Sequence, residues 1–214
     1  MKRGVQMLEI KDIGKIDIPE KFGLGMYDDT VEMDDLVWEL ESQDKAVFCT
    51  NGASRFVVVS DNWDRVVKIS FNYVIDEETG EIDEFKTKDY CSNEVFYYEM
   101  AKEWGVEKAF TDIKLEGYTN NGKGHPYYSA ERVISNCCFE FSDESKKQAQ
   151  ECYYNPFIDN INFVASIIEF YGKDFWLKLL DFIEYYGIRD LHNGNLGHRE
   201  DGSPVILDYA GFNE

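Results

Sequence analysis

The sequence predicts an α+β fold with strands in the first half and helices in the second. Two patterns support this prediction. Short β-branched runs, separated by Asn-Gly and Asp-Asn turns, occupy residues 46–70 and are typical of antiparallel strands. Apolar residues at helical spacing, interrupted by glycine, occupy residues 158–187. We therefore expect the strands and the helices to form separate parts of the molecule.

The composition favours a folded protein and limits the classes of partner that we expect it to bind. The chain has 214 residues, of which 43% are hydrophobic and 15% aromatic, enough for a real core. Its formal net charge is −20. Nucleic acids and anionic membranes attract clustered Lys and Arg, so we expect neither direct nucleic-acid binding nor membrane binding. The acidity favours solubility, and it would also suit a basic partner protein or a metal ion.

No targeting signal or metal-binding cysteine pattern is visible. Residues 1–15 lack the apolar stretch of a signal peptide, and no run is long enough to span a bilayer. The five cysteines show neither CxxC spacing nor His partners at zinc spacing. We expect free thiols in a reducing cytoplasm.

The pattern divides the chain into three expected parts. Residues 1–45 form an acidic leader, in which 34–41 (DDLVWELE) favours a short helix with either a solvated acidic face or a docking surface. Residues 46–133 form a strand-rich lobe, and residues 134–214 form a smaller helical lobe. A hinge between the lobes is expected near 131–135.

The strand-rich lobe is expected to hold a three-stranded meander and a later hairpin. The runs AVFCT, FVVVS and RVVKIS, within residues 46–70, predict the three strands of the meander. The charged segment 72–88 reads as an exposed hairpin insertion. Segments 114–118 and 126–134 predict two further strands around a Gly-rich turn.

Capping residues and glycine stops predict three helices. Ser92 or Asn93 caps the first helix, which ends at Gly105. A second helix lies before Asp174, which caps a third helix that stops at Gly187.

The strongest functional signal lies near the C-terminal end of the chain. Asp190 and Asn195 are five residues apart in RDLHNGN, and Asp208 follows thirteen residues after Asn195 in ILDYAG. Oxygen ligands on loops suit Mg²⁺, which completes its shell with substrate phosphates. Asp190 could accept a proton from a hydroxyl nucleophile. Any one of these residues would fit an ordinary turn, but the ordered set favours phosphoryl transfer.

With this ordered set the chain resembles the protein-kinase-like superfamily. The family's pattern is a catalytic-loop Asp, an Asn five residues later, and then an Asp-x-Gly-type metal motif. The resemblance implies a two-lobed kinase-like fold, with an antiparallel β N-lobe that carries one helix and a reduced helical C-lobe. It also implies that Asp190 positions or deprotonates the attacking hydroxyl, while Asn195 and Asp208 bind Mg²⁺.

The same resemblance assigns a lysine and a glutamate in the first lobe. Lys68, in RVVKIS, corresponds to the lysine that pairs with the phosphates of ATP. Its expected helix partner is Glu94, because Glu-Val-x-x-Tyr carries apolar residues at the family's offsets, with Glu99 as the rival. Five residues turn a helix about 140° past one full turn, so the two glutamates cannot both face the cleft. The alternative for Lys68 is an edge-strand lysine that points to water.

Two further segments are expected to contact the nucleotide. Gly52, Ala53 and Ser54 lie where the family's glycine-rich loop covers the phosphates, although this turn has one glycine instead of three. An ordinary hairpin turn is the alternative. Glu131 and Val133 match the hinge whose backbone would bind adenine. ATP and Mg²⁺ are therefore the expected cofactors.

Within the superfamily the chain resembles the protein kinases of T7-type bacteriophages over residues 46–214. The shared features are Asn-Gly between the first strands, RVVKI, DxHxGN and IxD. This resemblance implies a cytoplasmic protein of a bacterium or of a phage-infected host cell. One departure is DYAG in place of DFG. Another is that the chain stops three residues after Gly211, without the segment that forms the peptide-substrate platform in ordinary protein kinases.

The expected function is ATP- and Mg²⁺-dependent transfer of phosphate to a protein or small-molecule hydroxyl, as a Ser/Thr protein kinase or autokinase. The alternative is a pseudokinase-like binding protein that inhibits or recruits a basic host protein through its acidic surface. The retained kinase residues favour the enzyme: Lys68, Glu94, Asp190, Asn195 and Asp208. The charge and the missing platform favour the alternative.

Overall fold

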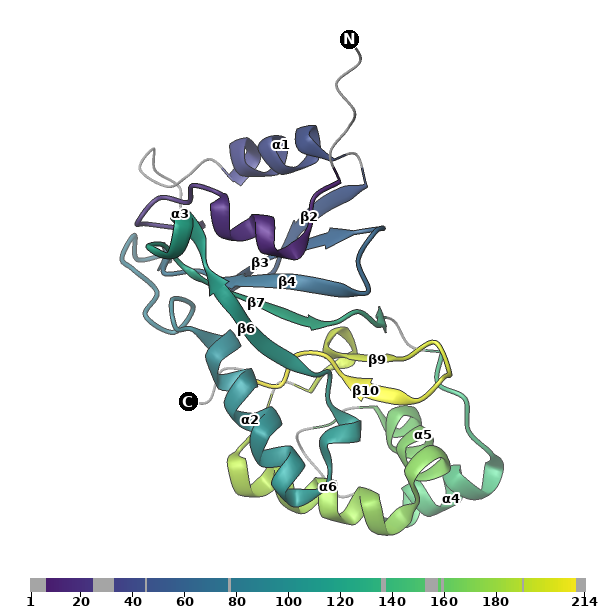
Figure 1. The fold of residues 1–214 in the computed structure, drawn as a ribbon. Helices are drawn as coiled ribbons and strands as arrows, with labels where there is room; N and C mark the ends of the chain where they lie inside the picture. The colour runs from purple at the N-terminus through teal and green to yellow at the C-terminus, as the bar shows by residue number, and fades with distance from the viewer. Residues whose placement is uncertain are drawn as a thin grey trace. The chain divides into compact units, whose positions relative to one another are not determined.

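A computed structural model describes the chain in residues 7–24, 33–44, 46–76, 78–135, 138–152, 158, 160–189 and 191–210. The fold is α+β, as the sequence predicts (Figure 1). The chain divides into two compact units: a first unit of Met1–Ser92 and Ile113–Glu131, and a second unit of Asn93–Asp112 and Arg132–Glu214.

Among the described residues, the first unit is built on a five-stranded antiparallel sheet of order β2-β3-β4-β7-β6 (Figure 1). Its strands are β2 (Val47–Asn51), β3 (Arg55–Ser60), β4 (Arg65–Ser70), β6 (Ile113–Tyr118) and β7 (Pro126–Glu131). The predicted meander is confirmed, because β3 pairs with both β2 and β4. The predicted later hairpin is confirmed by β6 and β7, which the short α3 (Thr119–Gly122) connects.

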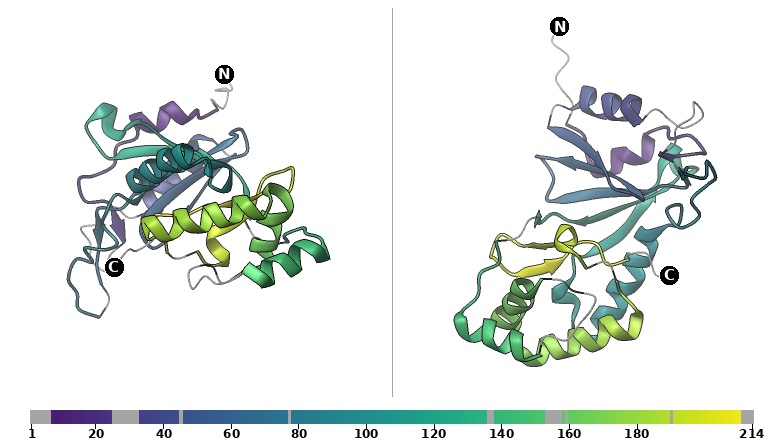
Figure 2. Two further views of the ribbon diagram at one scale, coloured as in Figure 1. Left: turned by 90° about the horizontal axis from the view of Figure 1, so that it is seen from below. Right: turned by 180° about the vertical axis from the view of Figure 1, so that it is seen from behind.

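Residues from the expected leader contribute to the core of the first unit. Their elements are the 3-10 helix η1 (Ile10–Lys15), β1 (Gly23–Leu24) and α1 (Met33–Gln43). Ile18, Phe22 and Leu40 are buried in the same core as Val58 and Val67 of the sheet. Both α1 and η1 lie over the sheet (Figures 1 and 2). The acidic segment is therefore anchored by the apolar residues between its acids.

The segment after β4 forms the expected hairpin insertion. Its short β5 (Tyr73–Val74) pairs in parallel with β1, and Ile75 forms an antiparallel bridge with Ile82. The turn between them contains Gly80, whose φ of +71° favours glycine. Ile82 is 51% exposed, so the insertion lies at the surface.

The first predicted helix is α2 (Tyr90–Trp104), and its cap differs from the prediction. A carboxylate oxygen of Asp89 accepts a hydrogen bond of 3.2 Å from the backbone N–H of Ser92. The N-cap of α2 is therefore Asp89, and the predicted N-cap at Ser92 or Asn93 is wrong. Asp89 also accepts hydroxyl hydrogen bonds from Ser70 at 2.8 Å and from Tyr128 at 2.6 Å. Contacts with the sheet select this cap, and they cannot be seen in the local sequence.

The second unit holds α4 (Asp143–Cys152), α5 (Ile161–Tyr171) and α6 (Lys173–Tyr186), which pack in succession (Figure 2). The helices α5 and α6 were predicted, whereas α4 was not, because its sequence is too polar for a clear apolar face. The side chain of Asn160 caps α5 by accepting the N–H of Asn162. The predicted cap of α6 at Asp174 is wrong, since the N-cap is Gly172 and Asp174 lies in the first turn.

A small sheet of order β10-β9-β8 completes the described part of the second unit. It comprises β8 (Ile134–Ser135), β9 (Leu196–His198) and β10 (Pro204–Ile206), and β9 pairs with both neighbours. Gly197 permits this packing, because a Cβ there would lie 2.6 Å from the carbonyl oxygen of Ile134. Arg199 then joins the hairpin to the 3-10 helix η2 (Glu107–Ala109), because its guanidinium donates a hydrogen bond of 2.9 Å to the carbonyl oxygen of Lys108.

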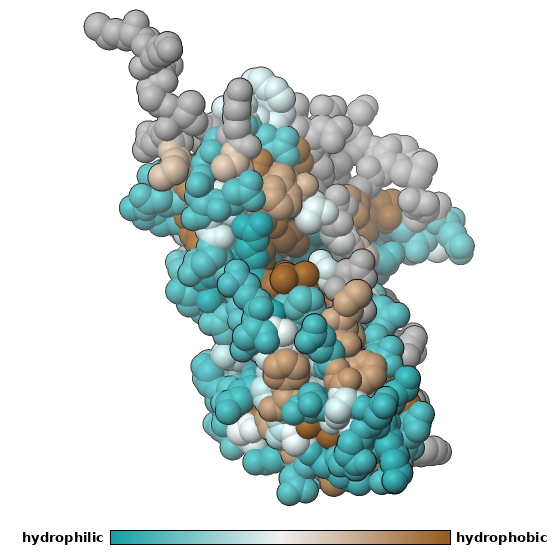
Figure 3. All heavy atoms as spheres, turned by 90° about the vertical axis from the view of Figure 1, so that its right-hand side faces the viewer, coloured by the Kyte–Doolittle hydropathy of each residue, from teal (hydrophilic) through white to brown (hydrophobic). Residues whose placement is uncertain are grey.

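The surface of the molecule is largely hydrophilic where Figure 3 shows it. Hydrophobic residues form small groups between hydrophilic ones on that face. No helix in the described ranges combines the length and the apolar character needed to cross a membrane.

Candidate functional site

The two predicted metal ligands start from neighbouring backbone positions in the second unit. Asn195 ends the 3-10 helix η3 (Asn193–Asn195), and Asp208 follows β10. The backbone N–H of Leu207 donates to the carbonyl oxygen of Asn195 at 2.8 Å. This bond ties the residue before Asp208 to the predicted catalytic loop. Amide and carboxylate oxygens are ligands that Mg²⁺ accepts.

The catalytic-loop segment is fixed by its own histidine. Ring nitrogen Nδ1 of His192 accepts a hydrogen bond of 2.9 Å from the backbone N–H of Gly194. A Cβ at Gly194 would lie 2.7 Å from that ring, so a side chain at this position would require the imidazole to move. The carbonyl of His192 accepts the N–H of Asn195 at 2.9 Å. Asp190, the predicted catalytic residue, lies outside the described residues.

Thr111 forms hydrogen bonds with residues on both sides of Asp208. Its N–H donates to the carbonyl of Ile206 at 3.0 Å, and its hydroxyl donates to the carbonyl of Leu207 at 3.3 Å. Its own carbonyl accepts the hydroxyl of Tyr209 at 2.8 Å. Both Thr111 and Tyr209 are buried, with exposed fractions of 2% and 0%. We call this set of three hydrogen bonds the Thr111 clamp.

Electrostatics place Glu94 and Asp208 near the same phenol ring. Burial, followed by the negative charges of Glu94, Asp112 and Asp208, raises the pKa of Tyr209 well above its ordinary value. The Tyr209 hydroxyl therefore stays protonated and can donate to Thr111. The predicted lysine partner and one predicted metal ligand thus lie within electrostatic reach of one buried side chain.

Burial distinguishes the two glutamate candidates on α2. Glu94 is fully buried, with an exposed fraction of 0%. The side chain of Glu99 is 55% exposed and pairs with Lys102 at 2.7 Å on the surface. A surface ion pair of this kind explains Glu99 without any site. Glu94 is therefore the better candidate for a functional carboxylate.

Lys68 lies on a central strand of the first unit. In the sheet, β4 lies between β3 and β7, and Lys68 is opposite Val57 and Tyr128. Only 8% of Lys68 is exposed, so it is not the edge-strand lysine of the alternative interpretation. Because side chains alternate along a strand, Lys68 lies on the face opposite Val67 and Ile69, which belong to the core under α1.

The turn expected to cover the phosphates has ordinary hairpin geometry. The backbone N–H of Gly52 donates to the carbonyl of Arg55 at 3.0 Å, between β2 and β3. Ala53 is exposed, whereas Ser54 is buried. A Cβ at Gly52 would meet nothing within 4 Å, so this position does not require glycine. The glycine-rich-loop assignment therefore stays a prediction.

The expected adenine hinge lies at the boundary between the units. Glu131 ends β7 in the first unit, and Val133 precedes β8 in the second. The division falls directly after Glu131, close to the expected hinge at 131–135. The role of both residues in binding adenine stays a prediction.

The donor set at Asn195 and Asp208 is small. Within the described ranges, no group of three or more His, Cys, Asp or Glu side chains could hold a metal ion. Asn195 and Asp208 would supply only two protein ligands, one amide and one carboxylate. Such a pair fits Mg²⁺, which usually keeps several waters and binds through one or two carboxylates plus substrate phosphates.

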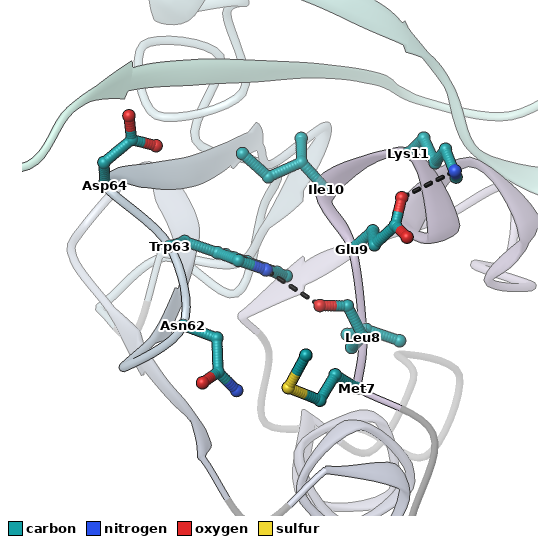
Figure 4. A pocket seen from close by; sticks show the side chains of 8 residues that line it. All are labelled: Met7, Leu8, Glu9, Ile10, Lys11, Asn62, Trp63 and Asp64. Carbon is teal, nitrogen blue, oxygen red and sulfur yellow. Dashed lines mark hydrogen bonds and ion pairs between the residues drawn. The ribbon is translucent and has the colours of Figure 1, made fainter.

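A pocket of about 620 Å³ lies in the first unit, and none of the predicted site residues lines it (Figure 4). It is lined by Met7–Lys11 and by Asn62–Asp64 of the turn between β3 and β4. The indole N–H of Trp63 donates to the carbonyl of Leu8 at 2.8 Å, and Glu9 pairs with Lys11 at 2.6 Å. The hydrogen bond between Trp63 and Leu8 links the N-terminal segment to the turn between β3 and β4, so the two walls of the pocket are joined by a structural contact.

Sequence reasoning missed Thr111 and the hydroxyl of Tyr209. The tyrosine had a visible signal, because it directly follows the predicted metal ligand Asp208. Thr111 had none, since two of its three clamp bonds use backbone atoms that every residue carries.

Glu94, Asn195 and Asp208 belong to the second unit, and Lys68 belongs to the first. These residues and contacts carry the assignment of the site. No protein-family model matches this chain, and no curated protein matches it.

Proposed function

We propose that this protein is an ATP- and Mg²⁺-dependent phosphotransferase that acts on a hydroxyl group, as a Ser/Thr protein kinase or autokinase of the kind found in T7-type bacteriophages. The observation that carries the proposal is the junction at Asn195 and Asp208, joined through the N–H of Leu207 and held by the Thr111 clamp.

Each predicted residue has a defined role in this proposal. Asn195 and Asp208 would hold Mg²⁺, which when bound neutralises phosphate charge. Lys68 would contact phosphate oxygens, and Glu94 would be its carboxylate partner. Asp190 would orient the acceptor hydroxyl and take its proton as the new O–P bond forms and the bond to the leaving ADP breaks. The pairing of Lys68 with Glu94 stays a prediction, because the two lie in different units.

A chain of this size can support that chemistry. Phosphoryl transfer needs little covalent participation from the protein, so positioning and charge neutralisation supply most of the catalysis. The side chains required are few, and 214 residues contain all of them.

The test is incubation of the full chain with γ-labelled ATP, with and without a cell lysate. We expect label on a protein, and we expect Mg²⁺ with ATP to raise the melting temperature. Asp208→Asn should lose the Mg²⁺-dependent shift. Asp190→Ala should lower label transfer by about 100-fold or more. Asp174→Asn, an exposed position in α6, is the matched control and should behave as wild type.

The outcomes separate the enzyme from the pseudokinase-like binding protein. Mg²⁺-dependent ATP binding without label transfer would favour the binding protein, which the net charge of −20 also suits. Absence of any ATP-dependent shift in the wild-type protein would contradict both kinase-like alternatives.

A further inference from the structure

Five aromatic side chains form a continuous surface on the second unit, where α2 meets the end of α6. They are Phe96, Tyr97, Trp104, Tyr185 and Tyr186, and we call them the aromatic surface. The ring of Tyr186 lies 6.2 Å from Phe96, 5.9 Å from Tyr97 and 4.9 Å from Tyr185. Trp104 continues the surface at 5.5 Å from Tyr185. Phe96 is 52% exposed and Tyr185 is 73% exposed.

The aromatic surface rests on a buried ring. Phe182 is fully buried and lies 4.7 Å from Tyr186 and 5.6 Å from Trp104. Tilted and edge-to-face contacts of this kind fix the rings, so little side-chain freedom would be lost on binding. Phe96 and Tyr185 are exposed and the other three rings are partly exposed, and grouped aromatic rings at a surface are typical of protein interaction sites.

Acidic residues predominate on the same helical stretches, residues 93–104 and 177–186. The exposed acids are Glu99, Glu103, Asp181 and Glu184, against the exposed lysines Lys102 and Lys178. Lys102 is already engaged, because it pairs with Glu99 and lies 4.6 Å from the ring centre of Tyr98. Apart from this ion pair, three exposed acids remain on these two stretches against one exposed lysine, which favours a positively charged partner.

The aromatic surface is also close in sequence to the proposed catalytic residues. Phe96 lies two residues after Glu94, and Tyr186 lies four residues before Asp190. Glu94 lies on α2, the helix that also carries Phe96, Tyr97 and Trp104 of the aromatic surface.

We propose that the aromatic surface binds an arginine-rich segment of the protein that receives the phosphate. Guanidinium planes stack on aromatic rings and pair with carboxylates, which a lysine ammonium does less well. The net charge of −20 would steer a basic partner toward the molecule. Binding of the segment depends only on this surface, whereas its role as the phosphate acceptor rests on the proposed function.

The test uses the full chain and a fluorescein-labelled arginine-rich peptide with one serine, with binding measured by fluorescence anisotropy at physiological ionic strength. The combined variant Phe96→Ala and Tyr185→Ala should bind the peptide about tenfold more weakly than wild type. Phe85→Ala is the matched control, since Phe85 is 55% exposed but lies in the first unit. A lysine-for-arginine peptide should also bind more weakly.

Three results would overturn the proposal. They are no peptide binding by the wild type, equal binding by the combined variant, and wild-type self-association that the combined variant abolishes, which would assign the surface to a second copy. Asp208→Asn should keep full peptide binding, because Asp208 is not part of the surface. Peptide binding without phosphate transfer to its serine would support the surface and contradict the acceptor role, whereas the proposed function is judged separately, from label transfer to the chain itself or to lysate proteins.

Discussion

The hydroxyl of Tyr209 is a buried hydrogen-bond donor that lies directly after the predicted metal ligand Asp208. It donates to the carbonyl of Thr111, and that carbonyl is buried within the Thr111 clamp. Nearby carboxylates and burial keep the phenol protonated, which preserves its role as donor. The backbone position of Asp208, the adjacent residue, therefore depends on the hydrogen bond between Tyr209 and Thr111.

Removal of this hydroxyl should cost stability and metal-dependent binding together. Tyr209→Phe leaves the Thr111 carbonyl buried without its partner, so we expect the free energy of unfolding to fall by about 1–3 kcal/mol. We also expect weaker Mg²⁺-dependent stabilisation by ATP, because the backbone beside Asp208 loses a restraint. Chemical denaturation and thermal shifts measure the two effects. Tyr185→Phe, at a position that is 73% exposed, should change neither property. Equal stability of wild type and Tyr209→Phe would refute the importance of this bond.

Among the elements, the start of α4 is linked to α5 by hydrogen bonds to the exposed carboxylate of Glu169. Oxygen Oε2 of Glu169 accepts hydroxyl hydrogen bonds of 2.6 Å from both Ser142 and Ser145. It also accepts the backbone N–H of Ser142 at 3.1 Å. These bonds, chiefly that from the Ser142 hydroxyl, lower the pKa of Glu169 from its ordinary value of 4.5. The charged form of Glu169 therefore stabilises the start of α4.

The contribution of Glu169 should depend on pH in a defined direction. Because its pKa is lowered by folding, its stabilisation is present above the ordinary value of 4.5 and is lost as the pH falls through the lower folded value. Glu169→Gln should therefore melt at a lower temperature than wild type at about pH 7, and the difference should vanish at strongly acidic pH. Glu184→Gln, on the exposed side of α6, is the control for removal of one charge. A difference that stays constant with pH would rule out this explanation.

At the scale of the whole molecule, charge is the dominant feature. The chain has 42 acidic residues against 22 Lys and Arg. Several described ion pairs join exposed neighbours along the chain, such as Glu99 with Lys102 and Glu9 with Lys11. Such pairs contribute little to stability, so they do not offset the long-range repulsion between acids.

Added salt should therefore stabilise the protein. Raising the ionic strength from about 0.01 M to about 0.15 M shortens the Debye length from about 30 Å to about 8 Å, which screens the repulsion. We expect the melting temperature to rise over this range in scanning calorimetry. Sodium chloride and choline chloride should act alike, because the effect requires no specific ion. A fall in melting temperature would mean that attractive ion pairs outweigh the repulsion.

Much of the fold could be predicted because its signals are local. The meander of β2, β3 and β4 follows from β-branched runs between turn residues. The ends of α2 and α6 follow from Gly105 and Gly187, whose positive φ angles suit glycine. The spacing of Asn195 and Asp208 likewise identified residues that the structure joins through Leu207.

Other features depend on contacts between residues far apart in the chain. The cap of α2 is Asp89 instead of Ser92 because two strands hold its carboxylate. The sequence showed that Glu94 and Glu99 cannot face the same way, but only packing decided that Glu94 is the buried one.

The sequence by itself determined the meander, the later hairpin, the helices α2, α5 and α6, and the candidate residues, since periodicity and turn chemistry act between near neighbours. Tertiary structure alone decided that the acidic leader joins the core and that Thr111 supports Asp208. The hydroxyl of Thr111 bonds to a carbonyl 96 residues away, and no local pattern encodes a contact of that range.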